Sequence, residues 1–200
     1  MMPREFISGF VLAGGRSRRM GLDKTQIPWR EGTLLSHAVE VMREAAGTVF
    51  IVSSREIQAP LAPVLADKVG DRGPLAGIHT ALSATATDWN LMLAVDLPLV
   101  SASLLRFIAD ACSGAAEQVV IPRIQGKLQT LCAAYHRQVL AECDAALRNG
   151  ESSIVRFLTR IPMRTLAEAE LADQGFPAEM FLNVNTPDDI IRAQGAAESR

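Results

Sequence analysis

The sequence predicts an α/β protein, a single Rossmann-like domain in which a mostly parallel sheet is flanked by helices. Short apolar runs alternate with helical patterns of about 10–15 residues, as in successive βαβ units. A chain of 200 residues, 48% of them apolar, suits one core better than two. The sequence has no internal repeats and no low-complexity segment. We therefore expect one domain over residues 1–200, with ligands bound at the edge where the parallel strands end.

The first half of the chain contains three expected strands and two expected helices. Residues 6–13 form an apolar run that ends in two glycines, as a buried strand does where it meets a loop. Residues 33–46 place apolar side chains on one helical face behind a threonine that suits the N-cap. A second apolar run predicts a strand over 49–53. A glycine-proline pair opens a helix over 73–86, and a third apolar run, 89–95, leads into an aspartate.

The second half continues the alternation as far as residue 159. A serine at the start of 101–114 suits the N-cap of a helix. Strands are expected at 118–121 and 131–135, and helices at 137–148 and 152–159.

The C-terminal region carries weaker signals. Residues 167–177 show the least pattern and are expected to be the least structured part of the chain. A last strand is expected at 180–184, and Pro187 opens a last helix. The tail from Gln194 onward is expected to fray.

Composition excludes several classes of function. A formal charge of -2 and a pI near 5.9 argue against a nucleic-acid partner. No apolar run approaches the roughly 18–20 residues of a membrane span, and no signal-peptide pattern precedes the first strand. We therefore expect a cytoplasmic protein without a membrane partner. The cysteines and histidines lack disulfide or metal spacings, so we expect free thiols and packing or surface histidines at Cys112, Cys132, Cys143, His37, His79 and His136.

The segment 12–24, LAGGRSRRMGLDK, is the most informative one. Gly14 and Gly15 let backbone N–H groups approach a ligand, because no Cβ stands in the way. Three arginines and Lys24 follow, and these cations can meet a triphosphate. The segment fits neither the P-loop nor the dinucleotide fingerprint. The alternative is a glycine turn followed by a solvated basic patch.

Asp96, in the run VDLP after the third strand, is the best candidate for a metal ligand. A carboxylate at the end of an apolar strand needs a cation or hydrogen-bond donors. Mg²⁺ binds one or two carboxylates together with phosphate oxygens, so one aspartate is enough to anchor a metal–nucleotide complex. The alternative is that Asp96 caps the helix that follows.

Two further segments have the character of a binding site. Asp67 and the turn 71–77, DRGPLAG, offer small residues and a helix N-terminus that could admit a base or ribose, although an ordinary loop-to-helix junction explains them equally well. In 183–189, NVNTPDD, two asparagines can each donate and accept hydrogen bonds. Helix capping by Thr186 is the competing account of this second segment.

Together these segments resemble the molybdenum cofactor guanylyltransferases within the wider group of MobA-like NTP transferases. The signature LAGGxSxRMGxDK is met by 12–24, the GPLAG turn by 73–77, the acidic-proline motif by 96–98 and NVNTPDD by 183–189. The order and spacing agree over nearly the whole chain. The chain departs from relatives at Val52-Ser53-Ser54, where an asparagine is frequent, and at Thr130, where a proline is common.

The resemblance implies a fold like that of nucleotide-diphospho-sugar transferases, with Mg²⁺ as cofactor and GTP and molybdopterin as substrates. It also leaves room for contacts with other molybdenum-cofactor proteins. The N-terminal part would bind the nucleotide and the C-terminal part the acceptor. The implied residues are Leu12, Ala13, Gly14 and Gly15 around the nucleotide, Lys24 and Arg19 on its phosphates, Asp67 near the nucleoside, Asp96 on the metal, and Asn183 and Asn185 on the acceptor side.

Three other functions stay open from the sequence. A cytidylyltransferase or another nucleotidyltransferase of the same fold would use the same phosphate chemistry on a different base or acceptor. A nucleotide carrier would keep the glycine loop without metal-dependent turnover. A nucleic-acid binder would show strongly salt-dependent affinity, which the acidic pI disfavours.

Overall fold

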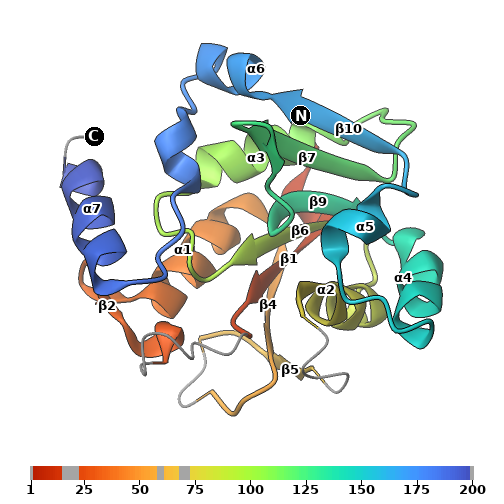
Figure 1. Cartoon of the computed structure of the whole chain (residues 1–200), viewed down its shortest axis with the longest axis horizontal. Coiled ribbons are helices and arrows are strands. Elements are labelled where there is room, and N and C mark those ends of the chain that lie inside the picture. Colours follow the sequence, from red (N-terminus) through yellow and green to blue (C-terminus); the bar gives the residue numbers. More distant parts are fainter. Residues whose placement is uncertain (1, 15–22, 58–60, 68–72, 199–200) are drawn as a thin grey trace.

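The computed structural model describes residues 2–14, 23–57, 61–67 and 73–198. Within these ranges a mixed sheet has the strand order β10-β7-β9-β6-β1-β4-β5, with β8 paired to β7 (Figure 1). Its strands are β1 Ile7–Leu12, β4 Thr48–Ser53, β5 Val64–Ala66, β6 Trp89–Ala94, β7 Val119–Ile124, β8 Lys127–Leu128, β9 Cys132–His136 and β10 Met163–Ala167.

The centre of the sheet is parallel. β1 lies between β4 and β6 and runs parallel to both, and Leu12 at its end is level with Val52 and Ala94. β9 runs antiparallel between β6 and β7, while β10 is parallel to β7. The predicted mostly parallel α/β sheet is therefore confirmed, with β9 and the short β8 reversed. The carboxyl ends of β1, β4 and β6 share one edge.

Helices cover both faces of the sheet. Their bounds are α1 Leu34–Ala45, α2 Pro74–Ala84, α3 Ala102–Ala111, α4 Val139–Arg148, α5 Ile154–Leu158, α6 Glu168–Asp173 and α7 Pro187–Glu198. The core has two parts, one with side chains of α1 and α3 and the other with those of α2, α4 and α5, on opposite sides of the sheet (Figure 1). Strand side chains alternate between these parts, with Val11 in the first and Phe10 in the second. Because both faces are covered, β1 and β6 are buried along their whole length and mostly apolar, with Ser8 and Asn90 as their polar residues.

Short elements connect the larger ones. They are the 3₁₀ turns η1 Arg4–Phe6, η2 Lys24–Gln26 and η3 Ala178–Phe181, and a hairpin of β2 Pro28–Trp29 and β3 Gly32–Thr33. The predicted helix caps are confirmed at two positions. Thr33 and Ser36 form a capping box at the start of α1, and the Ser101 hydroxyl accepts a hydrogen bond from the Leu104 amide at the start of α3.

The C-terminal region differs from the prediction. The prediction of a strand at 180–184 is wrong, because η3 covers the first half of this range and residues 182–185 form no regular element. Strand β10 was not predicted, and α6 lies in the stretch expected to be least structured. Helix α7 continues to Glu198, past the point where fraying was expected.

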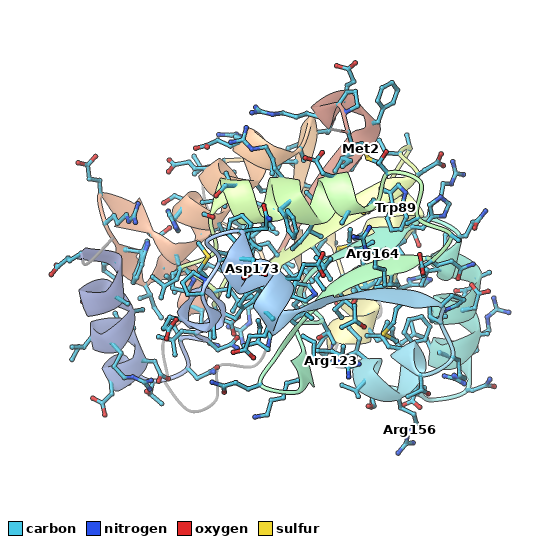
Figure 2. All side chains as sticks on the ribbon, turned by 90° about the horizontal axis from the view of Figure 1, so that it is seen from above. Met2, Trp89, Arg123, Arg156, Arg164 and Asp173 are labelled. Atoms are coloured by element: carbon cyan, nitrogen blue, oxygen red, sulfur yellow. The ribbon has the colours of Figure 1, made fainter. Side chains whose placement is uncertain are left out.

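The sequence signal of β10 is weak because it is an edge strand. Leu166 is the one fully buried residue among its five. Arg164, labelled in Figure 2, donates from Nη1 to the Ala111 carbonyl at the end of α3, at 2.9 Å. This strand is therefore held by backbone pairing and a polar contact as much as by an apolar run.

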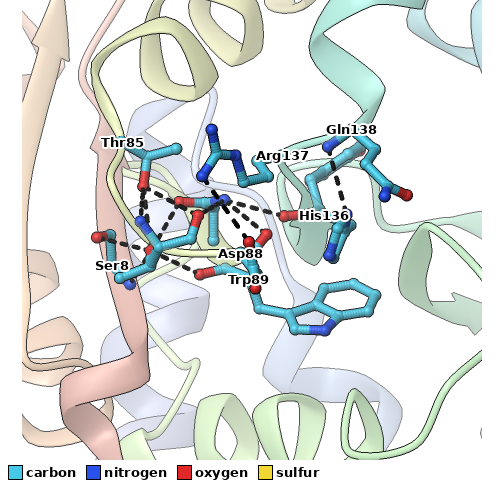
Figure 3. Close-up of polar contacts among 10 residues, drawn as sticks. Ser8, Thr85, Asp88, Trp89, His136, Arg137 and Gln138 are labelled. Carbon is cyan, nitrogen blue, oxygen red and sulfur yellow. Dashed lines mark hydrogen bonds and ion pairs between the residues drawn. The ribbon is translucent and has the colours of Figure 1, made fainter.

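A buried polar cluster lies at the amino-terminal ends of the central strands, where β1 and β6 begin (Figure 3). The Thr87 hydroxyl donates to Ser8 Oγ at 2.9 Å, and the Asn90 amide lies within 3.4 Å of the carbonyl oxygens of Thr87, Asp88 and Tyr135. Since Asn90 is fully buried, these bonds satisfy a group that would otherwise be costly to bury. The cluster fixes the start of β6 and, with it, the register of the strand that leads to Asp96.

Candidate active site

Three polar side chains from distant parts of the sequence meet beyond the ends of β1 and β6. Lys24 Nζ donates to Asp96 Oδ2 at 2.8 Å and to Asn185 Oδ1 at 2.7 Å. The side chains of Lys24 and Asp96 are only 19% and 22% exposed. A charge-assisted pair in this partly desolvated position is stronger than a pair in open solvent. Three of the predicted site residues therefore share one cluster.

Asp96 is presented by a turn that directly follows β6. Its carbonyl accepts a hydrogen bond from the Val184 amide at 2.9 Å, and the Leu97 amide donates back to Ala94 O at 3.3 Å. Capping of the next helix does not explain Asp96, because Ser101 is the residue that caps α3. The carboxylate is thus left for a cation, and Lys24 supplies one.

Lys24 is the first residue of η2, which follows the predicted glycine- and arginine-rich segment. The turn is capped by Asp23, whose Oδ1 accepts from the Thr25 amide at 3.0 Å and from the Thr25 hydroxyl at 2.8 Å. Thr25 is only 2% exposed, so this anchor is inside the protein. Gly15 and Arg19, with the arginines beside them, lie outside the described residues.

The segment before α7 serves two purposes at once. Asp189 Oδ2 accepts from the amides of Asn185 and Thr186 and from the Thr186 hydroxyl, while the Thr186 hydroxyl accepts from the Asp189 amide. Hydrogen bonds to the Asp189 carboxylate lower its pKa, chiefly the bond from the Thr186 hydroxyl and next the bond from the Asn185 amide. The capping interpretation is therefore confirmed, and the same segment brings Asn185 to Lys24.

Asn183 and Asn185 flank Val184, which is buried and bonded to the Asp96 carbonyl. Asn185 reaches the Lys24 cluster. Asn183 is exposed, and its side chain makes no hydrogen bond to another described residue. The structure thus puts both asparagines beside Asp96, but only one of them in contact with the charged pair.

The predicted nucleotide-binding residues Leu12, Ala13 and Gly14 lie at the end of β1. Their backbone continues the sheet, since the Ala13 amide donates to Val52 O at 2.9 Å and the Val95 amide donates to Leu12 O at 3.2 Å. Gly14 is exposed, and among the described residues a Cβ on it would meet no atom within 4 Å apart from its neighbours in the chain. Packing against the described residues therefore does not require glycine here, and on their side the open space leaves the Gly14 backbone accessible to a ligand.

Asp67 lies at the same edge but apart from the Lys24 cluster. It follows β5, its amide donates to Ser53 O at 2.9 Å, and its Oδ1 accepts from the Thr80 hydroxyl of α2 at 3.3 Å. The beginning of α2 carries Gly73, with φ of 71°, and Pro74 at the first helical position. Residues 71–72 of the predicted turn are outside the described ranges.

One site contact was not foreseen. His37 was expected to be a packing or surface residue. Its Nε2 atom lies 2.9 Å from the carbonyl oxygen of Pro98, and Pro98 is two residues after Asp96. No spacing in the sequence links a histidine in the first turn of α1 to the VDLP run, because the contact depends on how α1 packs on the sheet.

The chemistry of these donors suits a magnesium ion that arrives with phosphate. Across the described ranges no three His, Cys, Asp or Glu side chains gather as a metal cluster. Asp96 is a single hard oxygen ligand at the sheet edge, and Mg²⁺ commonly uses one or two carboxylates with substrate phosphates and water. The residues present therefore fit a metal that is shared with a nucleotide.

Fold and site together define an α/β nucleotidyltransferase. A model of the MobA-like NTP transferase domain matches residues 9–166, and the chain belongs to this family, as its motifs indicate. A Bacillus mycoides protein named "Probable molybdenum cofactor guanylyltransferase" is 31% identical over 194 residues, which cover 94% of this chain and 95% of that protein.

Solved structures agree with this assignment. The molybdopterin-guanine dinucleotide biosynthesis protein A of Archaeoglobus fulgidus matches with a TM-score of 0.84 and 26% identity, over 96% of this chain and all of that one. Rv0371c of Mycobacterium tuberculosis in complex with manganese has the same fold, with a TM-score of 0.63 and 22% identity over 96% and 98% of the two chains. No helix in the described ranges has both the length and the apolar character to span a membrane.

Proposed function

We propose that this protein is a molybdenum cofactor guanylyltransferase, which transfers GMP from GTP to the terminal phosphate of Mo-molybdopterin and releases pyrophosphate. The main support is the contact of Lys24 with both Asp96 and Asn185 at the carboxyl edge of the sheet. The names of the relatives in Bacillus mycoides and Archaeoglobus fulgidus support the same acceptor and base.

In this proposal the nucleotide lies over the end of β1. The backbone of Leu12, Ala13, Gly14 and Gly15 would contact GTP, and the open space at Gly14 supports a close approach. Asp67, beyond β5, would lie near the nucleoside. Arg19→Ala is expected to raise the KM for GTP, because Arg19 would contact the triphosphate.

Lys24 and Asp96 would carry the phosphate chemistry, together with Arg19. The acceptor phosphate is already anionic at neutral pH, so its attack on the α-phosphorus needs no strong general base. The work of the site is then to position the two anions and to neutralise their charge. Lys24 supplies a fixed ammonium for this purpose.

Asp96 would hold Mg²⁺, which would neutralise charge on the triphosphate when bound. The manganese complex of Rv0371c, a protein of the same fold, supports a divalent metal in this class of structure. Asn183 and Asn185 would bind the acceptor, since their amide groups can both donate and accept hydrogen bonds. The N-terminal part of the domain would thus bind the nucleotide and the C-terminal segment the acceptor.

Pyrophosphate release from each of the four common NTPs, with Mg²⁺ and with or without molybdopterin, tests the proposal. Release from GTP that depends on the acceptor, with a guanine dinucleotide product identified by mass, is the expected result. Release from CTP instead would retain the nucleotidyltransferase assignment and reject the guanylyl one. No release from any NTP would reject molybdopterin as the acceptor.

A further inference from the structure

Of the three histidines, His37 alone contacts the segment that carries Asp96. His79 Nε2 lies 2.9 Å from Asp144 Oδ1, between α2 and α4. His136 stacks edge-on against Trp89, with ring centroids 5.1 Å apart, at the opposite edge of the sheet (Figure 3). His37 stands apart because its polar atom reaches the turn at the candidate site.

We propose that His37 is a positioning residue of the transfer site, holding the Pro98 carbonyl and thereby the turn that orients Asp96. The inference rests on the proposed function in one respect, namely that Asp96 works on the metal–nucleotide complex. The contact itself does not depend on that function.

The direction of the hydrogen bond follows from the partner. A carbonyl oxygen can only accept, so Nε2 of His37 carries the hydrogen and donates to Pro98 O at 2.9 Å. Pro98 is buried, and within the described part of the chain His37 is the hydrogen-bond partner of its carbonyl. Removing the donor would leave this buried oxygen unsatisfied, which the turn could relieve only by moving.

Such a movement would reach Asp96 directly. The turn has two internal backbone bonds, from Leu97 to Ala94 and from Val100 to Leu97, each 3.3 Å long. Pro98 has no amide hydrogen to contribute a third. His37 therefore supplies an anchor from outside the turn, two residues after Asp96, and the Val184 amide supplies another at the Asp96 carbonyl itself, at 2.9 Å.

The start of α1 also anchors Lys24, the partner of Asp96. The Leu34 amide at the first position of α1 donates to Ile27 O at 2.9 Å, just after the turn η2 that begins with Lys24. His37 lies one turn further along the same helix. Because the capping box of Thr33 and Ser36 fixes this end of α1, one rigid helix start holds both members of the Lys24–Asp96 pair.

The surroundings of His37 restrain its ring. Trp29, which is 1% exposed, packs against it with ring centroids 6.1 Å apart. Burial lowers the pKa of His37 below 6.5, with Arg30 lowering it further and the Pro98 bond and Glu40 opposing the shift. The imidazole is therefore neutral near pH 7, with its one hydrogen committed to Pro98.

Two substitutions test the inference. His37→Phe keeps a ring without a donor, whereas His37→Gln keeps a donor near the position of Nε2. His136→Gln, at the far edge of the sheet, is the matched control. In the ligand-free proteins, we expect faster amide hydrogen exchange at Leu97 and Val184 in His37→Phe than in the wild type, with recovery in His37→Gln.

Transfer kinetics provide the second measurement. We expect His37→Phe to lower kcat by roughly 10–100-fold, as a displacement of about 1 Å at a site can do, while the KM for GTP changes little. His37→Gln should regain most of the loss. The inference would be overturned if the amide exchange rates at Leu97 and Val184 in His37→Phe equal those of the wild type. It would also be overturned if His37→Phe and His37→Gln lose kcat equally.

The two measurements separate this inference from the proposed function. Hydrogen exchange is read on the protein without substrate, so it tests the His37 anchor even if GTP is not the nucleotide. An inactive wild-type protein with the expected exchange pattern would reject the proposed function and leave the anchor in place.

Discussion

The ammonium of Lys24 bridges Asp96 and Asn185, with Nζ 2.8 Å from Asp96 Oδ2 and 2.7 Å from Asn185 Oδ1. These two partners belong to different halves of the proposed reaction, since Asp96 would serve the metal and nucleotide and Asn185 the acceptor. In this proposal both contacts adjust when substrates bind, because the same ammonium would also contact the phosphates. The bridge therefore makes separate predictions for the two sides.

On the metal side, Lys24→Met is expected to bind free Mn²⁺ roughly ten-fold more tightly than the wild type in the absence of nucleotide. The reason is that the ammonium competes with the metal for the Asp96 carboxylate, and a charge-assisted hydrogen bond is worth about 1.5–3 kcal/mol. Electron paramagnetic resonance of free Mn²⁺ measures the affinity. Asp96→Asn should abolish the binding. Equal affinity in Lys24→Met and wild type would show that the ammonium and the metal do not compete.

On the acceptor side, Asn185→Ala is expected to raise the KM for molybdopterin by about 3–10-fold, the loss of one hydrogen bond, with little change in the KM for GTP. Steady-state pyrophosphate release gives both constants. Asn149→Ala, an exposed asparagine at the end of α4, is the control. If the KM for GTP rises instead, Asn185 belongs to the nucleotide side.

The fold, and Lys24 and Asp96 as candidate site residues, could be predicted because their signals are local. β1 and β6 are mostly apolar since both faces are covered, and Thr33 marks the start of α1 by its own side chain. Asp96 follows the end of β6 directly, and Lys24 closes the glycine- and arginine-rich segment that follows β1. The topology alone then brings them to one edge.

The rest depends on packing that no local pattern records. The run 180–184 is apolar except at Asn183, but its buried residues are Met180, Phe181 and Val184, a spacing that suits a helical turn better than the alternation of a strand. β10 has one fully buried residue because it lies at the sheet edge. His37 reaches Pro98 across 61 positions, so its role follows only from the position of α1.

The buried state of His37 predicts a pH dependence of stability. Its pKa in the folded protein is lowered from 6.5, chiefly by burial. An unfolded chain therefore binds a proton more readily, and the free energy of unfolding should fall as the pH drops from about 6.5 toward the folded-state pKa. Arg30 and Glu40 are the charged groups near this ring.

Urea unfolding of the wild type at pH 7 and pH 5 measures this effect. His37→Gln and His37→Phe should both lose less stability between these values than the wild type does. If both variants lose as much stability between pH 7 and pH 5 as the wild type does, groups other than His37 cause the acid sensitivity.

The three cysteines predict a protein with no reactive thiol in its native state. Cys112, Cys132 and Cys143 are free and buried. Burial raises the pKa of all three thiols, to about 12 for Cys132 and Cys143, so the reactive thiolate is scarce at pH 8. Ellman's reagent should therefore react slowly with the native protein and release three equivalents after unfolding in guanidinium. Rapid release of one equivalent from the native protein would contradict this.

The most direct test of the account compares Asp96→Asn with Asp88→Asn in the transfer of label from α-³²P-GTP to molybdopterin. The two aspartates flank β6, one after its end and one before its start, and among the described residues the carboxylate of Asp88 makes a single long contact, of 3.9 Å, with Arg137. We predict that Asp96→Asn loses about 10²–10³-fold in Mg²⁺-dependent transfer at an unchanged melting temperature, and that Asp88→Asn retains wild-type transfer. Wild-type transfer by Asp96→Asn would contradict the account, because the carboxylate that Lys24 holds would then have no part in the reaction.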